Sequence, residues 1–318
     1  MRMRPIVGPV PDTGIRPAGG MDEIAGQLAA GGVAVLTGAG ISTESGIPDY
    51  RGVTGRHRRH SPMTYQDFVS DEENRRRYWA RGHVGRRAVA EARPNAGHHA
   101  VQALCAAGYV DAVITQNVDG LHQAAGTTDA VALHGSLDRV ICLDCGTIGP
   151  RDELDARLLA ANGEFLAAQD AAGLRVNPDG DIELPDDIVH TFRVVPCARC
   201  GGVLKPYVVF FGENVPRPRT QRCFDLIDAA DSLLVLGSSL AVLSGLRFVR
   251  RTAKDGKPVS IINLGPTRGD ALAHAHVALP LGQALTELTE RLARPQTSTA
   301  GAGRLPGREA GHRSDGRG

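Results

Sequence analysis

Four continuous apolar runs constrain the fold of this chain more than any other feature of its sequence. They span residues 33–37, 110–115, 232–236 and 259–263, and a polar or glycine-rich turn follows each of them. Runs of this kind are typical of strands that are buried on both faces of a parallel sheet. Helical stretches fall between the runs, so the sequence predicts an α/β fold with a mostly parallel sheet and helices on both faces.

The overall composition excludes several classes of protein. Hydrophobic residues make up 42% and charged residues 22% of the 318 residues, which fits a globular domain and neither a disordered chain nor a fibrous repeat. The formal net charge of +1 gives no overall field that attracts nucleic acid or an anionic membrane. Because we find neither an apolar run long enough for a membrane span nor a signal-peptide pattern in residues 1–17, we expect a cytoplasmic protein.

Four of the six cysteines form two Cys-x-x-Cys pairs, Cys142 with Cys145 and Cys197 with Cys200. Four thiolates suit tetrahedral coordination of one structural Zn²⁺, with no open position for catalysis. Residues 146–196 separate the pairs, a longer gap than the roughly 15–20 residues of a zinc ribbon. A redox dithiol and an iron–sulfur cluster are the competing interpretations. The two remaining cysteines, Cys105 and Cys223, lie in apolar helical stretches and are expected to be buried and inert.

Glycines follow the first apolar run directly. Residues 38–40 read Gly-Ala-Gly, and a helix is expected to start near Ser42. Glycines let a backbone approach a pyrophosphate, and a helix start offers free N–H groups and a positive dipole end. The position predicts a dinucleotide site, although Thr43 stands where the usual fingerprint needs its third glycine. A tight turn alone is the alternative.

Polar side chains follow the second apolar run. Gln116, Asn117 and Asp119 supply amide groups and a carboxylate at a strand end, where a ribose and a carboxamide could be bound. An Asx-rich turn that caps a short helix is the alternative. His134 ends the short apolar stretch 130–133, and taken alone it could equally be a structural histidine.

Taken together, these motifs resemble those of the sirtuins, the NAD-dependent protein-lysine deacylases. The resemblance covers roughly residues 21–292. It rests on Gly-Ala-Gly-Ile-Ser at 38–42, Gly-Ile-Pro-Asp-Tyr-Arg at 46–51, Thr-Gln-Asn-Val-Asp-Gly-Leu-His at 115–122, Leu-His-Gly at 133–135, the four paired cysteines, and residues 208–213, 237–240 and 263–265. Tyr50 and residues 77–81 and 265–268 resemble the class II branch of the family.

The resemblance implies that one group of residues binds NAD⁺, which is the co-substrate. Backbone N–H groups would bind the phosphates, and Asn263 and Leu281 would lie nearer the adenosine. The implied cofactor-binding residues are Gly38, Ala39, Gly40, Ser42, Ile47, Asp49, Tyr50, Arg51, Gln116, Asn117, Val118, Asp119, Gly237, Ser238, Ser239, Asn263, Leu264, Gly265 and Leu281.

The resemblance also implies that His134, Asn117 and Asp119 form the catalytic group. His134 would be the general base on a ribose hydroxyl, a role worth about 10²–10⁴-fold. Asp119 would hold the nicotinamide carboxamide together with the backbone at Ile47. Asn117 and Gln116 would position the ribose and a water molecule.

For the protein substrate, the resemblance implies an added β-strand between residues 211–214 and 239–244. The carbonyl group of Val209 would accept a hydrogen bond from the lysine Nε–H, and Phe210 or Phe211 would line the lysine tunnel or belong to the core. The implied substrate residues are Val209, Phe211, Gly212 and Glu213.

Tyr78 and Arg81 have the Tyr-x-x-Arg spacing that reads a carboxylate in the acidic-acyl branch of the family. On one helical face they could bind a succinyl-like or branched acidic acyl group. A surface ion pair on an arginine-rich helix is the alternative, and we favour it.

The predicted organisation has five parts. Residues 21–139 and 207–292 form a Rossmann-like NAD-binding domain that contains a helical insertion at 51–95. Residues 140–206 form a small zinc-binding domain. An N-terminal extension (1–20) and a disordered tail (293–318), which is rich in Pro, Gly, Ser, Thr and Arg, complete the chain.

The resemblance implies an enzyme that removes the acyl group from protein lysines, transfers it to ADP-ribose and releases nicotinamide. The expected cofactors are NAD⁺ as co-substrate and one structural Zn²⁺. The expected partners are proteins with acylated lysines, without nucleic acid or membrane, and a monomer is the expected state. Protein mono-ADP-ribosylation at the same site is the rival reaction. A zinc-containing nucleic-acid module and an ordinary NAD dehydrogenase are disfavoured.

Overall fold

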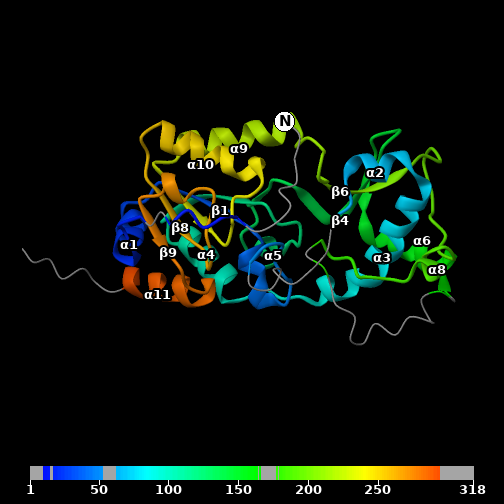
Figure 1. The fold of residues 1–318 in the computed structure, drawn as a ribbon, viewed down its shortest axis with the longest axis horizontal. Helices are drawn as coiled ribbons and strands as arrows, with labels where there is room; N and C mark the ends of the chain where they lie inside the picture. Colours follow the sequence, from blue (N-terminus) through cyan, green and yellow to red (C-terminus); the bar gives the residue numbers. More distant parts are fainter. Residues whose placement is uncertain are drawn as a thin grey trace, which may run out of the picture.

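The computed structural model describes residues 10–14, 17–52, 62–163, 165, 177 and 179–293. Two regions are visible in Figure 1, a larger one around a six-stranded sheet and a smaller one around a three-stranded sheet. The predicted tail lies outside the described residues except for Ala293, as do residues 1–9, 15 and 16 of the predicted N-terminal extension. In the described ranges, no helix is both long and apolar enough to cross a membrane.

All neighbouring strands of the six-stranded sheet are parallel, in the order β3-β2-β1-β7-β8-β9. Every residue of β1, β7 and β8 is buried, as the continuous apolar runs predict. The strands are β1 (Val33–Thr37), β2 (Val110–Thr115), β3 (Val131–Ala132), β7 (Ser232–Leu236), β8 (Val259–Ile262) and β9 (Ala275–Val277). The predicted α/β class is therefore confirmed.

Helices cover both faces of this sheet, which confirms the predicted layers (Figure 1). One hydrophobic core joins the sheet to α1 (Met21–Ala30), α4 (Ala96–Ala106) and α11 (Leu281–Ala293). A second core on the opposite face joins it to α9 (Arg217–Ala229) and α10 (Leu243–Lys254). Short elements connect the strands at the sheet edges, η1 (Ala39–Ser45), α5 (Leu121–Ala124) and η2 (Asp270–Leu272).

The smaller region is built on an antiparallel sheet in the order β5-β4-β6. Its strands are β4 (Gly135–Cys142), β5 (Ile148–Pro150) and β6 (Leu204–Val208), and its helices are α2 (Tyr65–Ser70), α3 (Glu72–Glu91), α6 (Arg151–Ala161) and α8 (Asp186–Val189). Phe68 of α2 and Trp79 of α3 share one core with Cys142 and Leu158. The sequence presents the helical and the cysteine-bearing segments as two insertions, whereas in the structure they pack as one region.

The register of the large sheet decides where its loops lie. Thr37, at the carboxyl end of β1, pairs with Thr115 of β2 on one side and with Leu236 of β7 on the other. Because these strands end level with one another, the three loops that follow leave the sheet side by side. Ligands bind at such strand ends in open α/β sheets.

Candidate functional site

A single crevice lies at the carboxyl ends of β1, β2, β7 and β8 and extends toward the smaller region. Every residue that the sequence assigns to the cofactor lines it, as does His134. These residues are Gly38, Ala39, Gly40, Ser42, Ile47, Asp49, Tyr50, Arg51, Gln116, Asn117, Val118, Asp119, Gly237, Ser238, Ser239, Asn263, Leu264, Gly265 and Leu281. The fold thus gathers at one place residues that lie more than 200 positions apart in the sequence.

The loop after β1 differs from the expectation in two ways. The helix expected near Ser42 is instead a 3₁₀ helix, η1, that begins at Ala39. The glycines also have a packing role, because a Cβ atom at Gly40 would lie 2.8 Å from the Cα atom of Gly237. At Gly38 a Cβ atom would lie 2.7 Å from the Cβ atom of Ser238. The two glycines therefore let the β1 and β7 loops touch.

Hydrogen bonds connect the carboxylate of Asp119 to the β1 loop. Its oxygen atoms accept from the hydroxyl group of Ser42 at 2.7 Å and from the backbone N–H of Leu121 at 2.9 Å. The side-chain amide of Asn117 donates to Ser42 Oγ at 3.0 Å and to the Gly38 carbonyl group at 3.1 Å. Burial raises the pKa of Asp119, although the hydrogen bonds from Leu121 and Ser42 oppose this shift. The network fixes the directions of a carboxylate and an amide at the crevice wall.

Both ring nitrogens of His134 are hydrogen-bonded. Nδ1 lies 2.8 Å from the carbonyl oxygen of Gln116, and Nε2 lies 2.8 Å from the hydroxyl oxygen of Ser244. A carbonyl oxygen only accepts, so Nδ1 carries the proton and Nε2 is the acceptor in the neutral ring. Burial lowers the pKa of His134 to about 4, and the nearby Arg219 and Arg247 contribute to the shift. His134 is therefore neutral at pH 7.

Tyr50 closes the crevice from the loop that follows η1. Its ring makes an edge-to-face contact with Phe211 at 6.0 Å between centroids, and the guanidinium group of Arg51 lies 6.0 Å from the Tyr50 centroid. Asp49 caps the turn by accepting a hydrogen bond from the backbone N–H of Gly52 at 2.7 Å. Burial raises the pKa of Tyr50, and Asp179 is among the groups that add to this shift. The phenol is therefore neutral.

The predicted substrate segment divides into two parts. Val209 and Phe211 line the crevice, whereas Gly212 and Glu213 do not. The Glu213 carboxylate instead accepts from the ammonium group of the buried Lys205 at 3.1 Å and from the backbone N–H of Phe210 at 2.8 Å. The structure thus places Glu213 behind the segment, where it holds the backbone beside the crevice in shape.

Tyr78 and Arg81 are not brought together in the crevice. Tyr78 is buried and lines it, whereas Arg81 lies outside it and forms an ion pair with Glu183. Asp179, from the loop between the cysteine pairs, lines the crevice on the same side as a residue that sequence reasoning missed. The crevice thus holds the tyrosine of this pair together with an aspartate, and the arginine lies outside it.

Sequence reasoning also missed Val10 and Met63, which line the crevice together with Leu240 of the motif 237–240. Leu240 has a φ of +53°, a conformation that is uncommon for a residue other than glycine. Backbone strain of this kind clusters at ligand sites. The motif Gly-Ser-Ser-Leu points to the segment but carries no signal for the strain, because Leu is not a typical left-handed residue.

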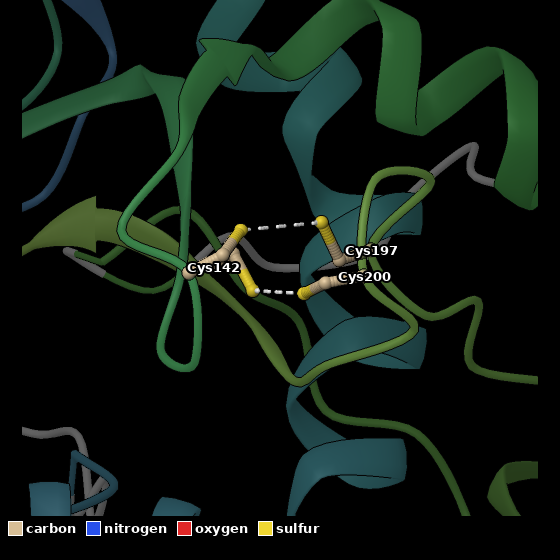
Figure 2. A group of neighbouring side chains, drawn as sticks. Cys142, Cys197 and Cys200 are labelled. Atoms are coloured by element: carbon tan, nitrogen blue, oxygen red, sulfur yellow. Dashed lines mark hydrogen bonds between the residues drawn. The ribbon is translucent and has the colours of Figure 1, made fainter.

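The four paired cysteines converge at the end of the small sheet, as Figure 2 shows for Cys142, Cys197 and Cys200. All four sulfur atoms lie within 4.8 Å of one another, with 3.5 Å between Cys142 and Cys200 and 3.9 Å between Cys145 and Cys197. Four sulfur atoms about 2.3 Å from one tetrahedral Zn²⁺ would lie about 3.8 Å apart. The backbone N–H groups of Cys200 and Arg199 lower the pKa of Cys197, which favours the thiolate. The donor set fits one closed structural zinc ion.

A parallel sheet with a crevice at its strand ends, joined to a four-cysteine centre, defines an α/β nucleotide-binding enzyme with a structural metal. Comparison with known proteins agrees with this class. Residues 38–244 match the model of the Sir2 family. NAD-dependent protein deacetylase 1 of Streptomyces coelicolor is 60% identical over 294 residues, which cover 92% of this chain and 97% of the relative. NAD-dependent protein deacetylase 1 of Mycobacterium avium is 49% identical over 271 residues, which cover 85% of this chain and 95% of the relative.

Solved structures show the same similarity. A complex of Sir2 with a p53 peptide and NAD⁺ aligns with a TM-score of 0.66 at 28% identity, covering 85% of this chain and 98% of the other. A Sir2 variant with a deacetylated p53 peptide and 3′-O-acetyl ADP ribose aligns with a TM-score of 0.69 at 29% identity, covering 86% and 98%. The chain belongs to the Sir2 family.

Proposed function

We propose that the crevice binds NAD⁺ together with an acylated lysine of a protein, and that His134, Asn117 and Asp119 carry the reaction. The chain is an NAD-dependent protein deacetylase, in line with its family and with relatives that are 48–60% identical. NAD⁺ supplies the ADP-ribose that receives the acyl group, and nicotinamide is released. One observation carries the assignment of the site, the neutral imidazole of His134 in the same crevice as the glycine-containing β1 and β7 loops.

We propose that the polar groups at the ends of β1 and β2 hold the nicotinamide side of the cofactor. Asp119, fixed by Ser42 and Leu121, would accept a hydrogen bond from the carboxamide, which a carboxylate does well. Asn117 and Gln116 would orient the ribose. Gln116 supports this role because its side-chain amide donates to Ser238 Oγ at 2.8 Å and so ties β2 to the β7 loop.

We propose that Nε2 of His134 is the general base. Its Nδ1–H donates to Gln116, so the unprotonated nitrogen is Nε2, and it can accept a proton from a ribose hydroxyl group. Burial favours the neutral ring that a base requires. The zinc centre lies in the small region and is closed by four thiolates, so its proposed part is to hold that region in shape.

The peptide segment of the substrate would lie along Val209 and Phe211. The backbone N–H of Val209 is occupied, since it donates to the His134 carbonyl group at 2.7 Å. The carbonyl oxygen of Val209 is the group proposed to accept the lysine Nε–H.

Among acyl groups we propose that neutral ones such as acetyl are preferred to dicarboxylic ones. Asp179 would repel a second carboxylate in the crevice, and the cation of Arg81 is paired with Glu183 outside it.

Mass spectrometry of reactions with NAD⁺ and matched acetyl-lysine and succinyl-lysine peptides tests the proposal. We expect nicotinamide, deacylated peptide and O-acetyl-ADP-ribose, with the acetyl peptide as the better substrate. Protein that gains ADP-ribose without loss of an acyl group would instead support the rival transferase reaction. A faster reaction with the succinyl peptide would contradict the proposed role of Asp179.

Replacing His134 with alanine should remove deacylation while the protein still folds and holds zinc. Loss of a general base lowers the rate by about 10²–10⁴-fold. The measurement is the rate of O-acetyl-ADP-ribose formation, with zinc content as the check on folding. His99→Ala is the matched control, because His99 is exposed on α4 and should leave the rate unchanged. Retained turnover in His134→Ala would refute His134 as the base.

A further inference from the structure

Ser244 contacts the proposed base directly, yet neither the motifs nor the proposed function give it a part in the chemistry. It lies in the first turn of α10, is 3% exposed, and places its hydroxyl oxygen 2.8 Å from Nε2 of His134. This nitrogen is the atom that is proposed to take up a proton. A buried hydroxyl group at hydrogen-bond distance from the reactive atom of a base can decide where that atom points.

The direction of the hydrogen bond follows from the other side of the ring. Because Nδ1–H donates to the Gln116 carbonyl group, Nε2 has only a lone pair, and the Ser244 hydroxyl group is the donor. A neutral imidazole nitrogen accepts one hydrogen bond, so a ribose hydroxyl group must take the place of Ser244 on Nε2. Rotation about χ1 to another staggered position can move the serine hydroxyl aside.

The position of Ser244 is tightly fixed by its surroundings. The next residue is Gly245, where a Cβ atom would lie 2.5 Å from Oε1 of Gln116. The first turn of α10 thus packs against the same residue that anchors Nδ1 of His134. Burial of the ring and the nearby guanidinium groups of Arg219 and Arg247 disfavour the imidazolium form.

From these contacts we infer that Ser244 is a positioning residue for deacylation, which holds the His134 ring so that Nε2 is unprotonated and correctly directed before NAD⁺ binds. This inference rests on the proposed function, since it takes His134 as the base. Ser244 acts through His134 and needs no contact with the substrate.

In the reaction that the resemblance to the sirtuins implies, the base is needed only after nicotinamide has left, so the two phases of the reaction separate the predictions. For Ser244→Ala we expect acyl transfer at saturating NAD⁺ to fall about 3- to 10-fold, because a ring that is no longer held adopts other orientations in which Nε2 does not face the ribose. The exchange of labelled nicotinamide into NAD⁺, and the KM for NAD⁺, should stay at the wild-type level. Ser244→Thr keeps the hydroxyl group and should restore most of the rate.

A spectroscopic measurement reports on the contact itself. In protein labelled with ¹⁵N-histidine, the His134 Nε2 resonance should move toward that of an imidazole nitrogen without a hydrogen bond in Ser244→Ala, and return in Ser244→Thr. Ser232→Ala is the matched control. It removes a buried hydroxyl group at the opposite end of β7 and should change neither rate nor resonance.

Wild-type acyl transfer with an unmoved Nε2 resonance in Ser244→Ala would overturn the inference. An equal loss of nicotinamide exchange and acyl transfer would also overturn it, because that pattern indicates a general disturbance of the crevice. If His134→Ala keeps its deacylation activity, His134 is not the base, and the proposed function itself is refuted. If His134→Ala is inactive and Ser244→Ala is normal, only the role of Ser244 is lost.

Discussion

The crevice and the cysteine centre both join segments that are far apart in the sequence, but they do so by different means. At the crevice, strands of one parallel sheet end level with one another, and β1, β7 and β8 are buried along their whole length. At the cysteine centre, the outer strand β5 has three residues and none of them is buried. The first site depends on sheet register and backbone packing, and the second on the thiolates and a metal ion. Substitutions should therefore damage the two sites in different ways.

The two regions nevertheless meet at the proposed base. Strand β4 of the small sheet begins at Gly135, directly after His134, and the backbone N–H of Val209 donates to the His134 carbonyl group at 2.7 Å. A Cβ atom at Gly135 would lie 1.9 Å from the carbonyl oxygen of Tyr207, so only glycine fits between the two chains. A disturbance of the small sheet can thus reach the crevice through this backbone.

The largest effect is expected from Cys142→Ala, which removes one buried ligand from the four-cysteine centre. Structural zinc contributes about 10–16 kcal/mol in zinc-finger peptides at pH 7. This exceeds the stability of many domains, so the small region should unfold and activity should be lost. The chain has one tryptophan, Trp79, which is buried in the core that contains Cys142. Its fluorescence should shift to longer wavelength as zinc content falls.

Cys105→Ala is the control for this variant, because Cys105 lies on α4 and packs against the other core. It should keep its zinc and its Trp79 emission. A chelator strong enough to remove zinc from the wild type should reproduce the emission of Cys142→Ala. Native emission from Cys142→Ala after zinc loss would show that the metal is not what holds the small region.

A smaller effect, confined to the crevice, is expected from Gly40→Ala. The added Cβ atom would lie 2.8 Å from the Cα and carbonyl oxygen atoms of Gly237. Both are backbone atoms, so the clash can be relieved only if one of the two loops moves. Overpacking of this kind costs about 1–3 kcal/mol. The β1 and β7 loops should separate, and affinity for NAD⁺ should fall by about tenfold or more in calorimetry. Zinc content and Trp79 emission should be unchanged.

Gly149→Ala is the matched control in the other region. A Cβ atom at Gly149 meets nothing within 4 Å, so this variant should bind NAD⁺ and zinc normally. If Gly40→Ala also binds NAD⁺ like the wild type, contact between the two loops does not shape the cofactor site.

The smallest effect of a single side chain is expected in mild acid, at the buried histidines of the large region. Burial lowers the pKa of His98 to about 3 and that of His122 to about 4, whereas an unfolded histidine has a pKa of about 6.5. Below pH 6.5 the unfolded chain therefore binds protons that the folded chain does not, and stability falls as the pH drops toward 4. At pH 5 each histidine should lower the free energy of unfolding by about 1–2 kcal/mol.

Urea unfolding at pH 7 and pH 5 measures this loss, with zinc content followed in parallel because acid also releases metal from thiolates. Nε2 of His122 is hydrogen-bonded to the hydroxyl oxygen of Thr37 at 3.0 Å, so His122→Gln keeps a polar group there and should shrink the difference between the two pH values. His99→Gln, at an exposed position, should leave it unchanged. An equal pH dependence in both variants would contradict the role of the buried ring.

Most of the large sheet could be predicted because burial on both faces leaves a direct trace in the sequence. The run 33–37 and strand β1 coincide, and the run 259–263 exceeds β8 by one residue. Strand β9 and helix α10 were not predicted. The strand has only three residues, and the first turn of the helix contains Ser244 and Gly245, which are poorer helix formers than alanine or leucine. The position of helix α10 is instead set by packing of Phe248 and Val249 against the sheet.

In the candidate site, too, the sequence predicted some features and the tertiary structure decided others. The amino-acid sequence alone determined which chemical groups would form it, because polar and glycine residues directly after buried strands must meet at one edge of a parallel sheet. It also determined that four cysteines could hold one metal ion. Only the tertiary structure decided which neighbours these groups would have. Glu213 faces Lys205, Arg81 faces Glu183 and Nε2 of His134 faces Ser244, since such contacts depend on the packing of segments that no local pattern relates.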